Sequence, residues 1–168
     1  MDWCVAWVSI FLRNLQFEVA DKLERWWAQV KRPASPSMNC YFQILWNTEW
    51  AQVDSDNITK SFFPSPTSAG ILKSIHLSRQ LVQVLSGHSK LRSFLHRIGV
   101  ESEGTCPCRA NIETTQHFLF DCHLYHSLRA PMLHSCRNIP WPPPLNFFTT
   151  STHNLTLLKS FIHSTKRL

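Results

Sequence analysis

The sequence has 168 residues, of which 43% are hydrophobic, with seven Trp and eleven Phe, a content well above that of a disordered chain. This length suits one ordinary domain or two small ones. The net charge of +6 and the pI of about 9.2 exclude a strongly acidic protein and favour an anionic partner. Four Gly against ten Pro predict helices joined by stiff connectors rather than a glycine-rich barrel.

The cysteines and the apolar segments bear on the cellular compartment. Six cysteines could form disulfides, but the chain is long and three of the six cluster around a histidine. The segment Met1 to Leu12 is apolar yet short, and Asp2 stands where a signal peptide has basic residues. No stretch reaches the roughly eighteen apolar residues of a membrane span. We therefore expect an intracellular protein, nuclear or cytoplasmic, with no membrane partner.

The first part of the chain predicts one strand and two helices. Trp3 to Val8 is a short run of β-branched and aromatic residues, typical of a buried strand. Apolar residues recur at helical spacing from Phe17 to Lys31, and a run rich in Pro and Ser follows. A second helix is expected from Met38 to Val53. The segment from Asp54 to Ser68, rich in Pro, Ser and Thr, is expected to be extended and packed by its aromatic residues.

The remaining sequence predicts a series of short helices. They are expected at Ala69–Leu85, Lys90–Ile98 and Thr114–Leu128, with Gly87 as the C-cap of the first, since Gly tolerates a left-handed backbone. One last amphipathic helix is expected near the C-terminus, on Leu155, Leu158, Phe161 and Ile162. The fold is therefore expected to be mainly α, in small pieces.

One long stretch carries charge of a single sign. Between Asn57 and Val100 there is no Asp or Glu, whereas the basic residues are Lys60, Lys73, Arg79, Lys90, Arg92 and Arg97. Lys and Arg neutralise phosphates and release counterions, so this pattern favours nucleic-acid binding. A solvated basic face without a ligand would give the same pattern, and this alternative stays open.

A second pattern carries metal chemistry: Cys106-x-Cys108, eight intervening residues, His117, four intervening residues and Cys122. Three thiolates and one imidazole are a preferred ligand set of a closed, tetrahedral structural zinc site. Independent buried cysteines with a surface histidine are the main alternative, and a catalytic Cys–His pair lacks a recognisable orienting residue. Three further histidines could replace a ligand, namely His123, His126 and His134.

Together these motifs resemble a known family. The segments Leu85-Ser-Gly-His88 and Leu91-Arg-Ser-Phe-Leu-His-Arg-Ile-Gly99, with the Cys-x-Cys, His and Cys cluster, look like the C-terminal region of non-LTR retrotransposon polyproteins. The resemblance covers residues 73–168 and is most specific at Glu113-Thr-Thr-Gln-His-Phe-Leu-Phe-Asp-Cys122. It implies a reverse-transcriptase-associated zinc-binding module that grips RNA or DNA near the polymerase.

The N-terminal part resembles the last strand and helix of a ribonuclease H domain. Trp7-Val8 and Glu18-Val-Ala-Asp-Lys-Leu23 match that family in spacing, which places Asp21 on its last metal-binding carboxylate. Phe11 and Phe17 stand where the family has His and Asn. Cleavage with two Mg²⁺ ions requires several converging carboxylates, which the family supplies from earlier elements. We therefore expect no RNA cleavage by this chain alone, and a helix acid without catalytic role is the alternative for Asp21.

The sequence thus predicts a mainly α protein, with a small helical zinc-binding module preceded by an incomplete α/β ribonuclease H-like tail. Its four parts are expected at residues 1–32 (the tail), 33–70 (a connector), 71–138 (basic helices and zinc module) and 139–168 (a Pro-rich connector and the terminal helix). The expected function is binding of RNA, DNA or an RNA–DNA hybrid through Arg79, His88, Lys90, Arg92, Phe94 and Arg97, with Phe94 or His88 stacking on an unpaired base. Structural Zn²⁺ is the expected cofactor, with Mg²⁺ only if ribonuclease H activity exists. The alternatives are a ribonuclease H completed by another chain and an inactive relic of a retroelement.

Overall fold

The structure is a computed structural model that describes residues 36–54 and 57–168. The chain divides into two compact units, Met1–Ser55 and Asp56–Leu168. The strand predicted at Trp3–Val8, the helix predicted at Phe17–Lys31 and Asp21 lie outside the described residues. The ribonuclease H-like tail therefore stays a prediction, and so does the division into four parts.

In the first unit the described residues form one helix, α3, Pro36–Gln52. The helix expected from Met38 to Val53 is thus confirmed to within two residues at each end. Pro36 is the first helical residue, where its missing N–H costs no intrahelical hydrogen bond. Trp50 is buried, whereas Ile44 and Leu45 are exposed.

The second unit is built from short helical pieces, as the sequence predicts. In chain order they are α4 (Ile58–Phe62), the 3₁₀ helix η1 (Pro66–Ser74), α5 (Arg79–Leu85), α6 (Arg92–Arg97), the π-helix η2 (His117–Asp121), the 3₁₀ turns η3 (His123–Tyr125) and η4 (Ser127–Arg129), α7 (Ala130–Ser135), the 3₁₀ helix η5 (Leu145–Thr149) and α8 (Thr152–Thr165). Within the described residues the β-structure is a single bridge, between Thr105 and Ile112. The mainly α fold class is therefore confirmed.

Side-chain caps explain where several of these pieces begin. Asn57, Ser65, Ser78 and Ser151 each have an extended backbone, and the side-chain oxygen of each accepts a hydrogen bond from the amide three residues later. The continuous helix predicted at Ala69–Leu85 is wrong for this reason. Ser78 caps a new helix, α5, so the chain between η1 and α5 is extended.

The segment predicted to be extended from Asp54 to Ser68 contains α4, so that expectation is wrong in part. Asn57 starts the helix, because its Oδ1 atom accepts a hydrogen bond from the amide of Lys60 at 3.2 Å. The expected aromatic packing is confirmed, since Phe62 and Phe63 are both buried. The hydroxyl of Thr149 donates to the carbonyl of Phe62 at 2.6 Å and so joins α4 to η5.

The turn after α5 confirms the predicted cap at Gly87. Its φ is +70°, a left-handed conformation that costs Gly little. The amide of Gly87 donates to the carbonyl of Val84, and the amide of His88 donates to the carbonyl of Gln83. These two bonds form a Schellman motif, which ends α5 and redirects the chain towards α6.

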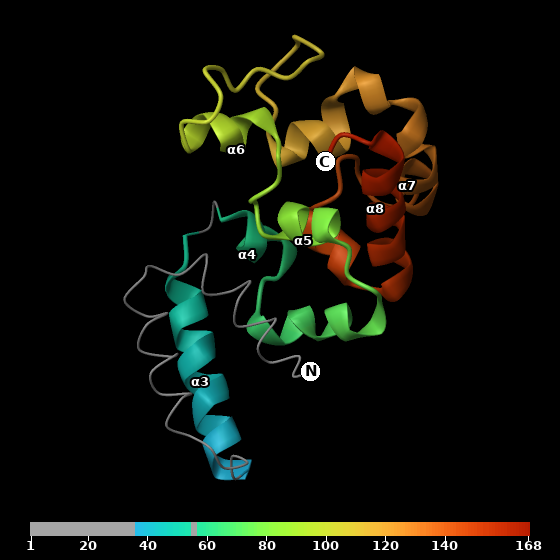
Figure 1. Cartoon of the computed structure of the whole chain (residues 1–168). Helices are drawn as coiled ribbons and strands as arrows, with labels where there is room; N and C mark the ends of the chain where they lie inside the picture. Colours follow the sequence, from blue (N-terminus) through green and yellow to red (C-terminus); the bar gives the residue numbers. More distant parts are fainter. Residues whose placement is uncertain (1–35, 55–56) are drawn as a thin grey trace. The chain divides into compact units, whose positions relative to one another are not determined.

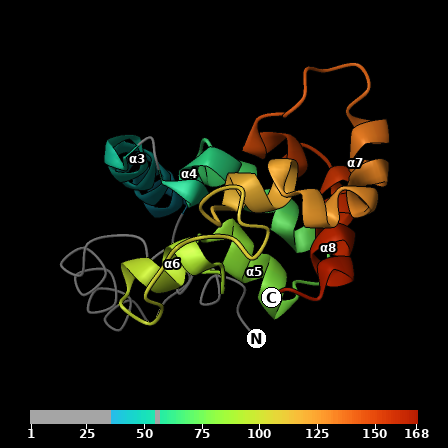
Figure 2. The ribbon, with the colours of Figure 1, turned by 90° about the horizontal axis from the view of Figure 1, so that it is seen from above.

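The core of the second unit surrounds α8, the predicted terminal helix. Figure 1 and Figure 2 show α8 beside α7 and close to η5 and α5. Its buried side chains meet aromatic residues from distant segments, and the ring of Phe161 lies 5.5 Å from that of Phe118. Phe148 of η5 stacks on Phe120 at 6.1 Å. Burial of these apolar side chains holds the short pieces together.

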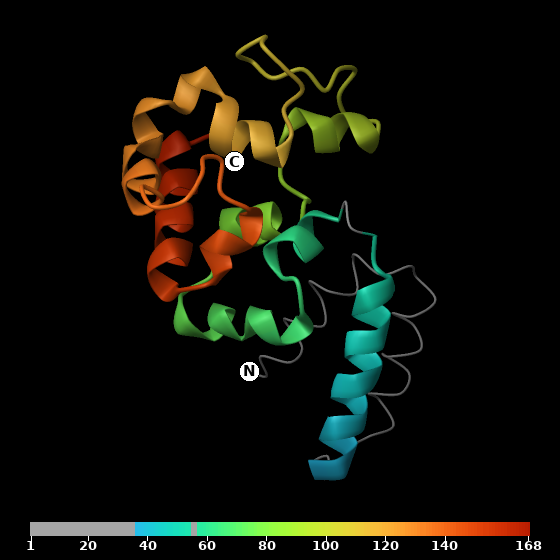
Figure 3. The same ribbon diagram turned by 180° about the vertical axis from the view of Figure 1, so that it is seen from behind.

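Helix α6 and the loop after it lie at one end of this unit, and η1 lies at the other, with α5 between them (Figures 1 and 3). No residue within α6 is buried, whereas its N-cap residue, Leu91, is. None of the helices in the described ranges is long and apolar enough to cross a membrane.

Candidate metal centre

A tight hairpin, which we call the metal loop (Thr105–Ile112), brings the first two cysteines together. The loop is closed by the bridge between Thr105 and Ile112 and by a hydrogen bond from the amide of Cys106 to the carbonyl of Asn111, at 2.9 Å. The amide of Arg109 donates a hydrogen bond to the carbonyl of Cys106 at 2.8 Å. Arg109 has a positive φ of 62°, which turns the chain sharply after Cys108.

The other two ligands come from the π-helix η2. The segment predicted to be helical at Thr114–Leu128 is mostly helical but not continuous, since the extended backbone of Cys122 ends η2 and the 3₁₀ turns η3 and η4 follow it. The amide of Cys122 donates to the carbonyl of His117, five residues earlier, at 2.8 Å. An α-helix advances about 100° per residue, so five residues would leave these side chains on different faces. The wider π-turn brings both residues to the same side.

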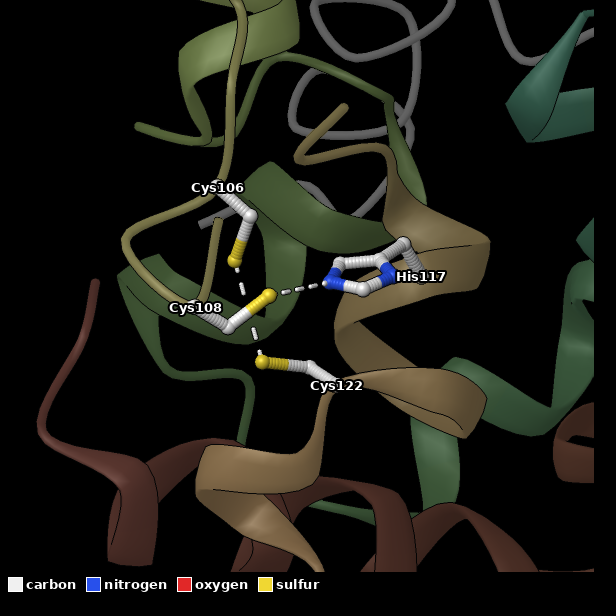
Figure 4. Close-up of side chains that lie close together, drawn as sticks. All are labelled: Cys106, Cys108, His117 and Cys122. Atoms are coloured by element: carbon white, nitrogen blue, oxygen red, sulfur yellow. Dashed lines mark hydrogen bonds between the residues drawn. The ribbon is translucent and has the colours of Figure 1, made fainter. Parts of the chain in front are cut away.

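The four ligand atoms converge on one point, as Figure 4 shows. The Sγ atoms of Cys106, Cys108 and Cys122 and a ring nitrogen of His117 all lie within 4.8 Å of one another. Cys106 Sγ is 3.7 Å from Cys122 Sγ, and Cys108 Sγ is 3.2 Å from His117 Nε2. Zinc–sulfur bonds of about 2.3 Å in a tetrahedron place two sulfurs roughly 3.75 Å apart. The residues therefore fit a four-coordinate metal ion without a large movement.

Burial and hydrogen bonding give the three thiols different acidities. Burial raises the pKa of Cys106 to about 12 and also raises the pKa of Cys122. For Cys108, burial again raises the pKa, but hydrogen bonds, the first from the amide of Ala110, outweigh it and lower the pKa to about 6. Two buried thiols without a cation thus resist ionisation, whereas a bound cation would stabilise three thiolates together.

Burial distinguishes His117 from the three other histidines that the sequence offers as ligands. His117 is buried, and its Nδ1 atom has no hydrogen-bond partner among the described atoms. The three other histidines considered as ligands, His123, His126 and His134, are exposed and lie outside the cluster. Cys106, Cys108 and Cys122 are free thiols, and so is Cys136, which is buried away from the cluster. The cluster can hold a metal ion, with one ligand atom from each of its four residues.

Two buried charged residues that the sequence analysis did not single out support the site. The side chain of Arg129 donates from Nε to the carbonyl of Leu119 at 2.7 Å and from an Nη atom to the carbonyl of Phe118 at 3.1 Å. These carbonyls belong to η2, so Arg129 stabilises the π-turn that carries His117. Glu113, fully buried, pairs with Arg167 at 2.7 Å. The two residues are 54 positions apart, and no local pattern reveals the pair.

The residues predicted to bind nucleic acid lie on or near α6, apart from Arg79 at the start of α5. Arg79, Lys90 and Arg97 are exposed. Arg92 is half-buried, and one of its Nη atoms donates to the carbonyl of Thr105 at 3.2 Å, which joins α6 to the metal loop. The structure thus brings part of the predicted basic set next to the metal cluster.

The two aromatic groups predicted to stack on a base contact each other. The rings of His88 and Phe94 meet edge to face at 5.1 Å. The guanidinium of Arg97 lies over the Phe94 ring at 5.3 Å, in a cation–π contact. Arg97 therefore presents a charged plane supported by an aromatic ring.

The net positive charge lies in residues 57–168, because acidic residues are scarce there. Residues 57–168 hold twelve of the seventeen Lys and Arg residues but only four of the eleven Asp and Glu residues. One of the four acids is the buried Glu113, so three acidic side chains remain at the surface. Arg109, on the metal loop, is an exposed basic residue that the sequence analysis missed.

Comparison with known proteins shows that about half of the chain is similar to retrotransposon polyproteins. It is 31% identical over 85 residues to a Retrovirus-related Pol polyprotein from type-1 retrotransposable element R1 2 of Nasonia vitripennis, a match that covers 51% of this chain and 21% of that protein. The R1 Pol polyprotein of Bradysia coprophila is also 31% identical over 85 residues, covering 51% of this chain and 8% of that protein. A third relative, from element R1 4 of Nasonia vitripennis, is 24% identical over 90 residues, covering 53% of this chain and 23% of that protein.

No family model matches the sequence, and no solved structure matches the chain. The matched segment spans less than a quarter of the length of each of these relatives. The expected resemblance to a retrotransposon polyprotein is nevertheless confirmed. About half of this chain is similar to the Pol polyproteins of R1 retrotransposable elements.

Proposed function

We propose that the chain is a nucleic-acid-binding part of a retrotransposon reverse transcriptase polyprotein, shaped by a structural zinc ion. One observation carries the proposal: a complete Cys₃His ligand set is joined directly to a basic helix. The similarity to R1 Pol polyproteins supports the same conclusion from an independent direction.

Zinc is the metal that best suits this ligand set. Three soft thiolates and an imidazole in a tetrahedral arrangement favour Zn²⁺ over the hard cations Mg²⁺ and Ca²⁺, which prefer oxygen. The protein fills all four positions, so the ion stabilises the fold and activates no water molecule. Cys106, Cys108, His117 and Cys122 would hold it, and the metal loop and η2 would be fixed against each other.

The basic residues near the metal loop supply the binding surface. Lys90 and Arg97 are exposed, and no acidic residue lies on α6 itself. The support of Arg97 by Phe94 restricts its guanidinium, which reduces the entropy lost when it contacts a phosphate or stacks on a base. The ligand would be RNA, DNA or an RNA–DNA hybrid of the element.

A salt titration with the zinc-loaded full chain tests this proposal. Binding to a single-stranded RNA and to an RNA–DNA hybrid would be measured by fluorescence anisotropy between about 50 and 200 mM salt. We expect affinity to fall steeply with salt, and Arg97→Gln to reduce the slope by about 1, the effect of one lost phosphate contact. Arg137→Gln is the matched control, because it removes an exposed charge after α7. Absence of binding at the lowest salt would refute the proposal.

The metal is tested separately. Purified protein is expected to contain one zinc ion per chain, and Cys108→Ser to lose it. Cys136→Ser is the matched control, since Cys136 is a buried thiol outside the cluster and its removal should leave the zinc content unchanged. Equal zinc content in both variants would show that the cluster is not the metal site.

A further inference from the structure

Helix α6 lacks a side-chain cap and has no buried residue within it, so its start needs support from elsewhere. It has six residues, far too few to be stable alone, and none of them is buried. Its N-cap residue is Leu91, which offers no side-chain hydrogen bond, and its first turn holds no acidic residue. The other short helices with a clear start, such as α4 and α5, have an Asn or Ser cap. Something outside α6 must therefore fix it.

That support comes from Glu113, the residue directly after the metal loop. Its Oε2 atom accepts a hydrogen bond at 2.7 Å from the backbone amide of Arg92, the first residue of α6, whose N–H has no acceptor within the helix. Its backbone carbonyl accepts from the hydroxyl of Ser93, also at 2.7 Å. Its own amide donates to the carbonyl of Gly104 at 2.8 Å. Glu113 thus holds the start of α6 and the base of the metal loop at once.

The carboxylate of Glu113 is in turn held by Arg167, which follows α8. The Nε and Nη2 atoms of Arg167 donate to Oε1 at 2.9 Å and to Oε2 at 2.7 Å, a bidentate pair. Figure 1 shows the C-terminal segment reaching the chain after the metal loop. Lys166, with a φ of +49°, ends α8 and turns the chain before Arg167. The carboxylate is fully buried, so without Arg167 its charge would have no counterion.

We propose that this pair, the Glu113–Arg167 clamp, sets the position of α6 against the metal loop, and that both residues are positioning residues for nucleic-acid binding. Their role in nucleic-acid binding rests on the function proposed above. Arg167 lies after α8 rather than on α6 or the metal loop, and its guanidinium is occupied by Glu113 rather than offered to a phosphate. It makes the metal loop and α6 one binding unit whose basic groups keep a fixed spacing.

Charge provides a sharp test, because the clamp and simple electrostatics predict opposite signs for Glu113→Gln. Loss of a negative charge should strengthen binding to a polyanion if charge alone matters. The clamp predicts weaker binding, since an amide has one acceptor oxygen for three donors and leaves α6 poorly held. Glu103→Gln is the matched control: it removes an exposed acid near α6 and should leave affinity equal or slightly higher.

The experiment uses the zinc-loaded full chain and two readouts. Amide hydrogen exchange of residues 92–98 is measured without nucleic acid, and affinity for a single-stranded RNA oligonucleotide is measured by anisotropy. For Glu113→Gln we expect exchange in α6 to rise about tenfold or more, the factor that matches one lost hydrogen bond to a charged group. We also expect weaker RNA binding and an unchanged zinc content of one ion per chain. Glu103→Gln should change neither exchange nor zinc content.

The two proposals can fail separately. If the unmodified chain does not bind RNA, the proposed function fails, and hydrogen exchange still tests the clamp. If Glu113→Gln leaves exchange in α6 unchanged, or tightens RNA binding, the clamp is wrong. Should Glu113→Gln fail to fold, Arg167→Lys replaces it: it keeps the charge but loses the bidentate contact, so α6 exchange must rise there as well. Unchanged exchange in Arg167→Lys would equally overturn the clamp.

Discussion

The second unit has a core end, around α8, and a metal end, around the metal loop, and different interactions stabilise the two. Around α8, apolar side chains from distant segments interlock, and Phe62, Phe148 and Leu158 are completely buried. Around the metal loop, the interactions are a ligand cluster, a bidentate ion pair and helix-capping hydrogen bonds. The core end is stabilised by the burial of apolar side chains, and the metal end by specific contacts between polar or charged groups.

The π-helix η2 connects these two ends. His117 points to the metal cluster, whereas Phe118, Leu119 and Phe120 are buried in the core. A movement of η2 therefore affects both ends at once. His117 is therefore a metal-ligating candidate that is adjacent in sequence to core residues, and perturbing each end separately measures how far the two ends depend on each other.

Metal removal should have the largest effect, and it should separate the two ends. A structural zinc contributes on the order of 10 kcal/mol to folding, comparable with the whole stability of an ordinary domain. We expect chelation to lower the thermal midpoint by about 20 °C or more. Hydrogen exchange should rise first in residues 104–122 and later in α8. Equal and simultaneous loss of protection in both segments would show that they unfold as one cooperative unit.

A cavity in the core should have the next largest effect on stability, and it should destabilise the core end rather than the metal end. Phe148, on η5, is fully buried and stacks on the ring of Phe120, so Phe148→Ala should cost about 3–5 kcal/mol in unfolding free energy. Chemical denaturation measures this cost. Zinc content at moderate temperature should stay at one per chain. Leu124→Ala, at a side chain 51% exposed, is the control and should cost well under 1 kcal/mol. A loss of zinc in Phe148→Ala would show that the metal site depends on distant packing.

Sequence patterns predicted the apolar end well where a helix is long or capped. The periodicity of Leu155, Leu158 and Phe161 identified α8, and Gly87 identified the end of α5. Periodicity failed at the break between η1 and α5, because apolar residues continue through it. The signal that was missed is Ser78, whose capping bond to Leu81 outweighs the apolar pattern.

At the metal end, the residue types predicted the four metal-ligating candidates, because Cys and His at this spacing have few other uses. The backbone that joins them was not predictable in the same way. A π-turn has no distinct sequence pattern, so His117 and Cys122 were placed on an ordinary helix. The partners Glu113 and Arg167 meet only through the fold, and a distant ion pair leaves no local signature.

A smaller effect is expected at the turn that links the two ends. Gly87 has a φ of +70°, and a Cβ atom there would lie 3.2 Å from the Cβ atom of Ile58. Gly87→Ala should therefore cost about 1–2 kcal/mol from the left-handed backbone, with a further cost from the close contact. Chemical denaturation measures the loss. If stability is unchanged, the turn does not hold the left-handed conformation in solution.

The smallest effect should have the opposite sign. Gly70 lies in η1, where its φ is outside the left-handed region and nothing lies within 4 Å of the position of an added Cβ atom. Gly70→Ala should therefore raise the unfolding free energy by about 0.4–1 kcal/mol, because alanine restricts the unfolded chain without strain in the folded one. Measured beside Gly87→Ala, the same chemical change gives opposite results at two positions. Destabilisation by Gly70→Ala would mean that residue 70 adopts a backbone conformation in η1 that alanine disfavours.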